Sequence, residues 1–212
     1  MKDDHPSPDT ATGSPVLFLA LGDSYTVGEG VAPEACWPHQ VAGRLRAEGW
    51  PLAPPVILAR TGWSTADLLA ALPTVPAGPY DLVSVLIGVN DQYRGGTPAA
   101  YRPALSALLE QAVARAGGEP GRVVVISIPD WSRTPFATGR DRRRVAAAIA
   151  AFNRVNRAEA ARCGAAYVDI TPLTSRRAGD PAFLAPDGLH PSGRHYAEWA
   201  QLILPTARSV LT

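Results

Sequence analysis

The sequence predicts a three-layer α/β/α protein in which helices cover both faces of a five-stranded parallel sheet. Short runs of consecutive apolar residues alternate along the chain with longer segments in which apolar residues recur every three or four positions. A strand that is apolar on both faces needs helices above and below it, as in a parallel sheet. At 212 residues, with no internal repeat and no second core, the chain has the length of one domain.

The apolar runs and the periodic segments define the expected elements in chain order. The predicted strands cover residues 16–21, 55–59, 82–87, 123–128 and 165–170, and the last has the weakest apolar pattern. The main predicted helices cover residues 37–48, 101–113, 145–155 and 192–204. A shorter helix is expected after Ser64 or Thr65, either of which can cap it. Pro205 is expected to end or kink the last helix.

Composition narrows the classes of partner and the compartment. The net charge is +1 and no basic tract dominates, so neither nucleic acid nor an anionic membrane surface is indicated. Residues 1–14 are polar and predict a disordered tail before a single domain at 15–212. They lack the apolar core of a secretory signal, and no later segment reaches the roughly 20 apolar residues of a membrane span. We expect a cytoplasmic protein, unless the chain is a processed form whose signal was removed. Cys36 and Cys163 are expected to be free thiols.

Chemically distinctive residues follow each predicted strand. They are Ser24, Gly62, Asn90, the pair Asp130 and Trp131, and the segment that contains Asp187 and His190. Because parallel strands all point one way, these residues gather along one edge of the sheet, where ligands bind. Gly62, Asn90 or Asp187 alone is typical of a turn. Their joint placement after successive strands favours a site instead.

These residue types suit acyl transfer. A serine hydroxyl such as that of Ser24 becomes a good nucleophile when a base takes its proton, and the imidazole of His190 does so near neutral pH. Asp187, three residues earlier, can fix the tautomer of the imidazole and offset its developing charge. The side-chain amide of Asn90 and the backbone N–H groups of Gly62 and Ser24 supply three donors for an oxyanion.

Two further groups of residues have alternative interpretations. His195 is the rival base, but it falls inside the predicted last helix, where a partly buried or surface histidine is expected. A metal site built from Asp187, His190 and His195 is disfavoured by the spacing of five between the histidines and by the lack of a further ligand pair. Arg142-Arg143-Arg144 either contact an anionic partner or form a solvated face, and the near-neutral charge favours the second.

At these positions the sequence resembles the GDSL or SGNH family of serine esterases and lipases. Its motifs occur in the family's order, as Gly22-Asp23-Ser24-Tyr25 with Tyr in place of the usual Leu, Gly62, Gly88-Val89-Asn90-Asp91 and Asp187-Gly188-Leu189-His190. The resemblance spans residues 16–204. It implies a flavodoxin-like sheet of strand order 2-1-3-4-5 and hydrolysis through an acyl-enzyme, with no metal and no cofactor. It also implies a catalytic triad of Ser24, His190 and Asp187 and an oxyanion hole formed by Ser24, Gly62 and Asn90.

The expected substrate is a small-molecule ester. Candidate walls for its acyl or alcohol group are Trp63, Tyr93, Trp131, Phe136 and Leu189, with core packing as the alternative for Trp63, Trp131 and Phe136. Because the chain has no segment for a large lid domain, small, short-chain or aryl esters are favoured over long-chain triglycerides.

Other functions fit the same fold. A thioesterase, a carbohydrate deacetylase or an acyltransferase would use the same residues, and a catalytically silent ligand-binding module is an alternative of a different class. A nucleotide- or phosphate-binding protein of flavodoxin type is disfavoured, because the first loop carries Asp23 and Glu29 and no Lys or Arg from residue 21 to residue 31.

Overall fold

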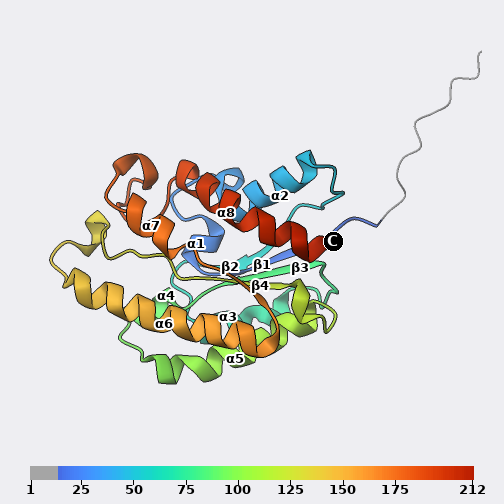
Figure 1. Ribbon diagram of the computed structural model, residues 1–212, viewed down its shortest axis with the longest axis horizontal. Coiled ribbons are helices and arrows are strands. Elements are labelled where there is room, and N and C mark those ends of the chain that lie inside the picture. The colour runs from blue at the N-terminus through green and yellow to red at the C-terminus, as the bar shows by residue number, and fades with distance from the viewer. Residues whose placement is uncertain (1–13) are drawn as a thin grey trace, which may run out of the picture.

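The computed structural model describes residues 14–212 and shows one parallel sheet between two layers of helices (Figure 1). The strand order is β2-β1-β3-β4-β5, and every neighbouring pair is parallel. The predicted fold class and strand order are confirmed. The polar tail predicted for residues 1–14 lies, except for its last residue, outside the described residues.

Each strand coincides with one of the predicted apolar runs and is shorter than it, and β1 ends one residue beyond its run, at Gly22. The strands are β1 (Phe18–Gly22), β2 (Val56–Ala59), β3 (Leu82–Leu86), β4 (Val123–Ile126) and β5 (Ala166–Val168). The three central strands are buried along their whole length, whereas β2 and β5 at the edges are partly exposed. The continuous apolar pattern is therefore strongest where helices cover both faces, which explains why the fifth run is the weakest.

Eight α-helices of 4 to 22 residues lie between and after the strands within residues 14–212. The α-helices are α1 (Ser24–Val27), α2 (Trp37–Ala47), α3 (Thr65–Ala71), α4 (Val89–Tyr93), α5 (Pro98–Arg115), α6 (Arg142–Cys163), α7 (Thr171–Arg177) and α8 (Gly193–Leu211). Short 3-10 turns are η1 (Pro33–Ala35), η2 (Leu72–Thr74), η3 (Pro120–Arg122), η4 (Pro135–Ala137) and η5 (Pro181–Phe183). Among residues 14–212, no helix combines the length and the apolarity that crossing a membrane requires.

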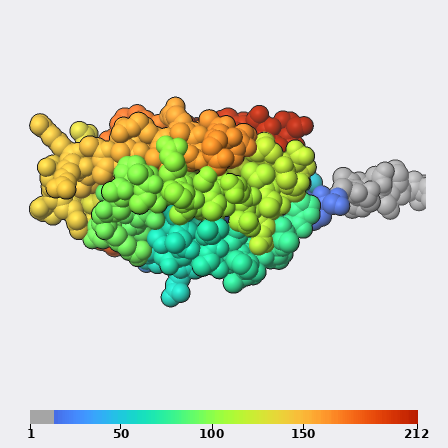
Figure 2. All heavy atoms as spheres, turned by 90° about the horizontal axis from the view of Figure 1, so that it is seen from below, coloured from blue at the N-terminus to red at the C-terminus, as the bar shows by residue number. Residues whose placement is uncertain are grey.

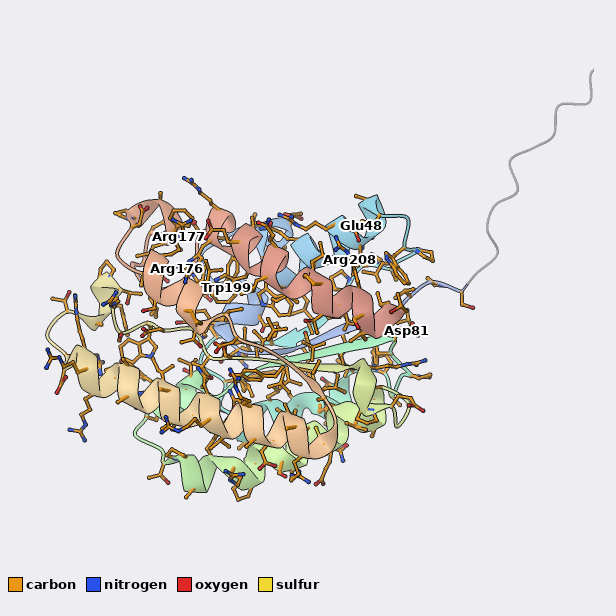
Figure 3. All side chains as sticks on the ribbon, viewed as in Figure 1. Glu48, Asp81, Arg176, Arg177, Trp199 and Arg208 are labelled. Carbon is orange, nitrogen blue, oxygen red and sulfur yellow. The ribbon has the colours of Figure 1, made fainter. Side chains whose placement is uncertain are left out.

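The long helices form the two outer layers. Helices α2 and α8 lie side by side on one face of the sheet, and α3, α5 and α6 cover the other (Figure 1). Figure 2 shows the second face, with the three helices packed closely together. On the first face, Glu48 at the C-terminal cap of α2 and Arg208 of α8 point toward one another (Figure 3), and Arg208 Nε donates to Glu48 Oε2 over 2.6 Å. Trp199 of α8 is fully buried beneath this layer.

Two details of the chain differ from or extend the sequence prediction. Helix α8 runs through Pro205 to Leu211, so Pro205 does not end it. The proline is exposed, which leaves water free to bond the carbonyl that loses its helical donor, while Ile203 and Ala207 on the buried side hold the helix against the core. Cys36 and Cys163 are free thiols, and Cys163 is only partly buried.

Candidate active site

Ser24 lies two residues after the end of β1, at the first position of the short helix α1. A Cβ on Gly22 would lie 2.1 Å from Thr26 Oγ1 and 2.6 Å from the Leu86 carbonyl oxygen, so only glycine allows the chain to turn so tightly there. Asp23 caps the helix, because its Oδ1 accepts a hydrogen bond of 3.0 Å from the Tyr25 N–H. Strand end, glycine and cap together aim the serine at the carboxyl edge of the sheet.

The carboxyl group of Asp23 is buried beside the serine. Its Oδ2 has no hydrogen-bond partner among the described residues. Burial, with a smaller contribution from the nearby carboxylate of Asp91, raises the pKa of Asp23 to about 7 against the lowering effect of the bond from Tyr25. Near neutral pH this carboxyl group is therefore protonated in a substantial part of the molecules, which limits the negative charge next to Ser24.

His190 and Asp187 reach Ser24 from the loop before α8. His190 Nε2 lies 2.9 Å from Ser24 Oγ, and His190 Nδ1 lies 2.5 Å from Asp187 Oδ2. The other carboxylate oxygen, Oδ1, accepts the backbone N–H groups of Leu189 and His190, each over 2.9 Å. Partial burial alone would raise the pKa of Asp187, but the bonds from the His190 side chain and from the two N–H groups outweigh it and hold that pKa below its usual value. The carboxylate is thus ionised at neutral pH and turned toward the imidazole.

The turn after β2 faces Ser24 from the other side. Gly62 has a φ of +84°, which an L-residue adopts with strain, and in the described part of the chain its N–H makes no hydrogen bond. Two side chains from the α4 region hold this turn. Asn90 Nδ2 donates to the Trp63 carbonyl over 2.9 Å, and Arg94 Nη2 donates to the Gly62 carbonyl over 2.7 Å. The remaining proton of the Asn90 amide and the N–H of Gly62 are left for another acceptor.

The side chain of Asp91 in α4 bonds to the first residue of α3 and so fixes the two helices relative to one another. Its Oδ2 accepts both the backbone N–H and the hydroxyl of Thr65, each over 3.0 Å. The strands β2 and β3 are thereby joined at their carboxyl ends by side chains of the residues that follow them. Asn90 consequently has a fixed position relative to Gly62.

A pocket of about 180 Å³ opens at this point. Ser24, Gly62, Asn90 and His190 line it, so the structure brings these predicted site residues to one cavity, with Asp187 behind His190. Its walls include four of the residues predicted from the sequence, namely Tyr93, Trp131, Phe136 and Leu189.

Trp63, the fifth residue predicted to form a wall, lies elsewhere. Its side chain is half-buried and packs against the hydrophobic core, while only its backbone carbonyl takes part in the site, as the acceptor for Asn90. Thr61 and Val89 line the pocket instead. Position after a strand end therefore predicted the location of the turn but not the direction of the tryptophan side chain.

His195, the rival base, is buried in the first turns of α8. Its Nδ1 donates to the Phe183 carbonyl over 3.1 Å, and its ring stands edge-on to the rings of Phe183 and Trp199. Burial lowers the pKa of His195 to about 4, although the bond to Phe183 opposes the shift. His195 does not bond to Ser24 and is a neutral core residue, more deeply buried than the sequence predicted.

Two residues that the sequence did not mark as part of the site, Tyr25 and Arg94, make contacts in it. Tyr25 is buried, and its ring centroid lies 5.3 Å from that of the His190 imidazole and 6.0 Å from that of Trp199. Its position next to Ser24 is the signal that could have identified it. Arg94 follows Asn90 by one helical turn, and no motif in the sequence marks it.

Comparison with known proteins identifies the family of the chain. The model of the GDSL-like lipase/acylhydrolase family matches residues 20–197. The chain belongs to this family. No curated protein matches the sequence. Among solved structures, TesA is 26% identical with a TM-score of 0.73, over 92% of this chain and 99% of that one.

Other structural relatives share the fold of the GDSL-like hydrolases. A lipase/acylhydrolase from Enterococcus faecalis is 24% identical with a TM-score of 0.72, over 93% of this chain and 97% of that one. AlinE4, an esterase of the SGNH-hydrolase family, is 22% identical with a TM-score of 0.66, over 95% of this chain and 100% of that one. Within residues 14–212 of the present GDSL-like hydrolase, no three His, Cys, Asp or Glu side chains gather in a way that would hold a metal ion.

Proposed function

We propose that the protein is a serine esterase that hydrolyses small carboxylic esters through an acyl-enzyme. The observation that carries the proposal is the unbroken chain from Ser24 Oγ to His190 Nε2 and from His190 Nδ1 to Asp187 Oδ2, with distances of 2.9 and 2.5 Å. The hydroxyl end of this chain opens on the pocket. A binding site alone needs no nucleophile, base and carboxylate in that order.

In the proposed acylation, Ser24 Oγ attacks the carbonyl carbon of the ester and its proton passes to His190 Nε2. The carbonyl electrons move to the oxygen and give a tetrahedral oxyanion. When the intermediate collapses, the bond from carbon to the leaving oxygen breaks, and His190 gives its proton to the departing alcohol. Asp187 holds the Nδ1 proton of the imidazole and stabilises the positive charge that the ring carries between these transfers.

Three donors support an oxyanion hole in this proposal. The N–H of Ser24 stands at the first position of α1, where a helix leaves the N–H groups without internal partners. The N–H of Gly62 is unpaired in the described part of the chain, and Asn90 Nδ2 has a second proton beyond the one given to Trp63. Because these groups are already held by the fold, little reorganisation accompanies the development of negative charge.

Deacylation repeats the sequence with water as the nucleophile. His190 takes a proton from a water molecule, the resulting hydroxyl attacks the acyl carbon, and the bond to Ser24 Oγ breaks. The proton returns to Ser24 Oγ through Nε2 and the carboxylic acid leaves. Thioesters, acetylated sugars and acyl acceptors other than water would pass through the same steps.

The dimensions of the pocket favour a small substrate. Its volume of about 180 Å³ is below the 300–1,000 Å³ that is typical of sites for drug-sized ligands. Tyr93, Trp131 and Phe136 present aromatic surface to whatever enters. A short acyl chain or an aryl group matches this space better than a long fatty chain.

Covalent labelling tests the nucleophile and separates an esterase from a silent binding module. A fluorophosphonate should label the wild-type protein and fail to label Ser24→Ala, whereas Ser209→Ala, which alters an exposed serine on α8, should be labelled fully. Hydrolysis of 4-nitrophenyl acetate should disappear in parallel. Labelling that persists in a folded Ser24→Ala variant, or an unlabelled wild type that cleaves no ester, would exclude the proposal.

A further inference from the structure

One wall of the pocket is a cluster of three aromatic rings that extends to the surface. The ring centroids of Tyr93, Trp131 and Phe136 lie 5.7 to 6.0 Å apart. Trp131 is buried, and its Nε1 donates to Gln92 Oε1 over 3.1 Å, which fixes the ring. Tyr93 is 43% exposed and Phe136 is 40% exposed, so the cluster runs from the pocket to its mouth.

Arg140 lies over this cluster. Its guanidinium carbon is 4.8 Å from the centroid of the Tyr93 ring, 5.6 Å from that of Trp131 and 5.8 Å from that of Phe136. Its Nη2 also donates to the Tyr93 hydroxyl over 2.8 Å. Stacking on aromatic faces holds a guanidinium in place while leaving its edge, with the remaining N–H donors, free for an anion.

The charge of Arg140 is not compensated. The segment of residues 133–144, to which Arg140 belongs, carries four more exposed arginines, namely Arg133, Arg142, Arg143 and Arg144. In residues 14–212, none of these five forms an ion pair, and we call them the arginine rim. The only acid in the segment, Asp141, uses its Oδ1 to cap α6 at the Arg144 N–H over 3.0 Å. The gold side chains at the start of α6 project into solvent at one end of the molecule (Figure 2).

Several arginines elsewhere on the surface are paired with a carboxylate. Arg102 pairs with Glu159, Arg157 with Asp169 and Arg177 with Glu198. The net charge is only +1 over the whole chain, so five arginines within residues 133–144 that have no ion pair in the described part of the chain are a local concentration of positive charge. Through Arg140, which stacks on the three aromatic rings of the pocket wall, part of this charge lies where it attracts anions.

We propose that the ester substrate carries an anionic group, which Arg140 binds at the mouth of the pocket while an apolar or aryl part stacks on Tyr93, Trp131 and Phe136. This inference rests on the proposed esterase function and names the class of its substrate. The planar donors of a guanidinium match the oxygen atoms of a carboxylate or phosphate, and such charge-assisted bonds are stronger than neutral ones. The rest of the arginine rim contributes to attraction at longer range.

Matched pairs of esters test the inference with carboxylates as the probe. For the acyl half the pair is 4-nitrophenyl hexanoate and the mono-4-nitrophenyl ester of adipic acid, which adds a carboxylate to a chain of the same length. For the alcohol half the pair is methyl 4-acetoxybenzoate and 4-acetoxybenzoate. The ratio of kcat/KM for the charged ester to that for the neutral ester is the measured quantity. In the pair whose charged half lies against Arg140, this ratio should fall as the salt concentration rises.

Variants test whether Arg140 is responsible for the preference for the charged ester. Arg140→Gln should lower kcat/KM for the charged ester of at least one pair about threefold to tenfold and change the neutral ester less than about twofold, the range of a single partly exposed charge contact. Arg140→Lys keeps the charge and should recover part of the loss. Arg154→Gln removes the same charge from an exposed position on α6 farther along the helix and should leave both ratios unchanged.

The possible outcomes separate this inference from the proposed function. If the neutral esters are cleaved in a Ser24-dependent reaction and Arg140→Gln leaves both ratios unchanged, the inference is overturned and the esterase function stands. If the charged and neutral esters lose rate equally, Arg140 only supports the aromatic wall, and the inference is again overturned. If no ester is cleaved, both proposals fall together.

Discussion

Two histidines five residues apart occupy environments that differ in chemistry rather than in burial. His190 is 8% exposed and His195 is 2% exposed, so depth does not distinguish them. Both ring nitrogens of His190 have side-chain partners, Asp187 on Nδ1 and Ser24 on Nε2. Within residues 14–212, the ring of His195 has one hydrogen-bond partner, the carbonyl of Phe183 on Nδ1, and its Nε2 has none. The comparison teaches that a histidine suited to proton transfer is recognised by the partners of both nitrogens.

The two histidines also differ in the charge close to the ring: a carboxylate faces His190, whereas the carboxylate near His195 is already neutralised by an arginine. The carboxylate of Asp187 is directed at the His190 imidazole and can stabilise a positive charge there. Near His195, the carboxylate of Glu198 is already paired with Arg177, whose Nη2 lies 2.6 Å from Glu198 Oε1. His195 is thus surrounded by aromatic rings and a neutral carbonyl, and it stays uncharged.

Exchanging each histidine for glutamine should give the largest contrast. Under the proposed mechanism, His190→Gln removes the proton acceptor of Ser24 and should lower kcat on 4-nitrophenyl acetate by about 10⁴-fold or more. His195→Gln can still donate to the Phe183 carbonyl and should keep kcat within about threefold. Circular dichroism and thermal unfolding of both variants check that the fold persists. Equal losses of kcat in two folded variants would contradict the distinction between the histidines.

Asp187→Asn gives His190 a neutral partner on Nδ1, as His195 has in the carbonyl of Phe183. The asparagine oxygen can still accept the N–H groups of Leu189 and His190, so the loop should keep its conformation. The amide NH2 then faces His190 Nδ1 and donates to it, which holds the imidazole in the tautomer with its proton on Nε2. His190 cannot accept the Ser24 proton in that tautomer and no carboxylate stabilises the imidazolium, so kcat should fall about 10²- to 10⁴-fold.

The matched control for this change is Asp180→Asn. Asp180 lies in the same region, where its Oδ1 accepts the Ala182 N–H at the start of η5 over 3.0 Å. The control makes the same change in charge away from the imidazole and should leave kcat within about twofold, as is usual for an exposed position. A loss in Asp187→Asn no larger than that in the control would mean that the carboxylate of Asp187 is not required.

The sequence was sufficient to predict the fold and the residues that meet at the candidate site. Parallel topology requires that the ends of successive strands lie together, so an apolar run followed by Ser24, Gly62 or Asn90 locates each residue without knowledge of side-chain packing. His190 was preferred over His195 because it lies outside the periodic pattern of α8, in a loop that can move its side chain toward the sheet edge.

Features that depend on side-chain direction or on distant contacts could not be predicted in this way. Trp63 follows a strand end, as Trp131 does, yet only Trp131 lines the pocket, whereas the half-buried side chain of Trp63 packs against the hydrophobic core. The bond from Arg94 to Gly62 joins residues 32 positions apart and has no local signal. The position of Arg140 over three rings likewise depends on contact between α4 and the segment that joins β4 to α6, which the sequence alone does not bring together.

The smallest expected effect concerns stability, and it tests whether His195 remains neutral. Its pKa of about 4 lies below the ordinary value of 6.5, so between these values the unfolded chain takes up a proton that the folded protein does not. The stabilisation by a neutral His195 is therefore complete above pH 6.5 and is lost as the pH falls toward 4, by at most about 3 kcal/mol. Urea unfolding at pH 7.5, 5.5 and 4.5 should show wild type losing more stability on acidification than His195→Gln, which cannot take up this proton. Because all carboxyl groups are common to both proteins, their contributions cancel in the difference between the two free energies of unfolding.

A difference between wild type and His195→Gln that does not change with pH would mean that His195 titrates alike in the folded and unfolded chains. The chemical contrast with His190 would then rest on geometry alone.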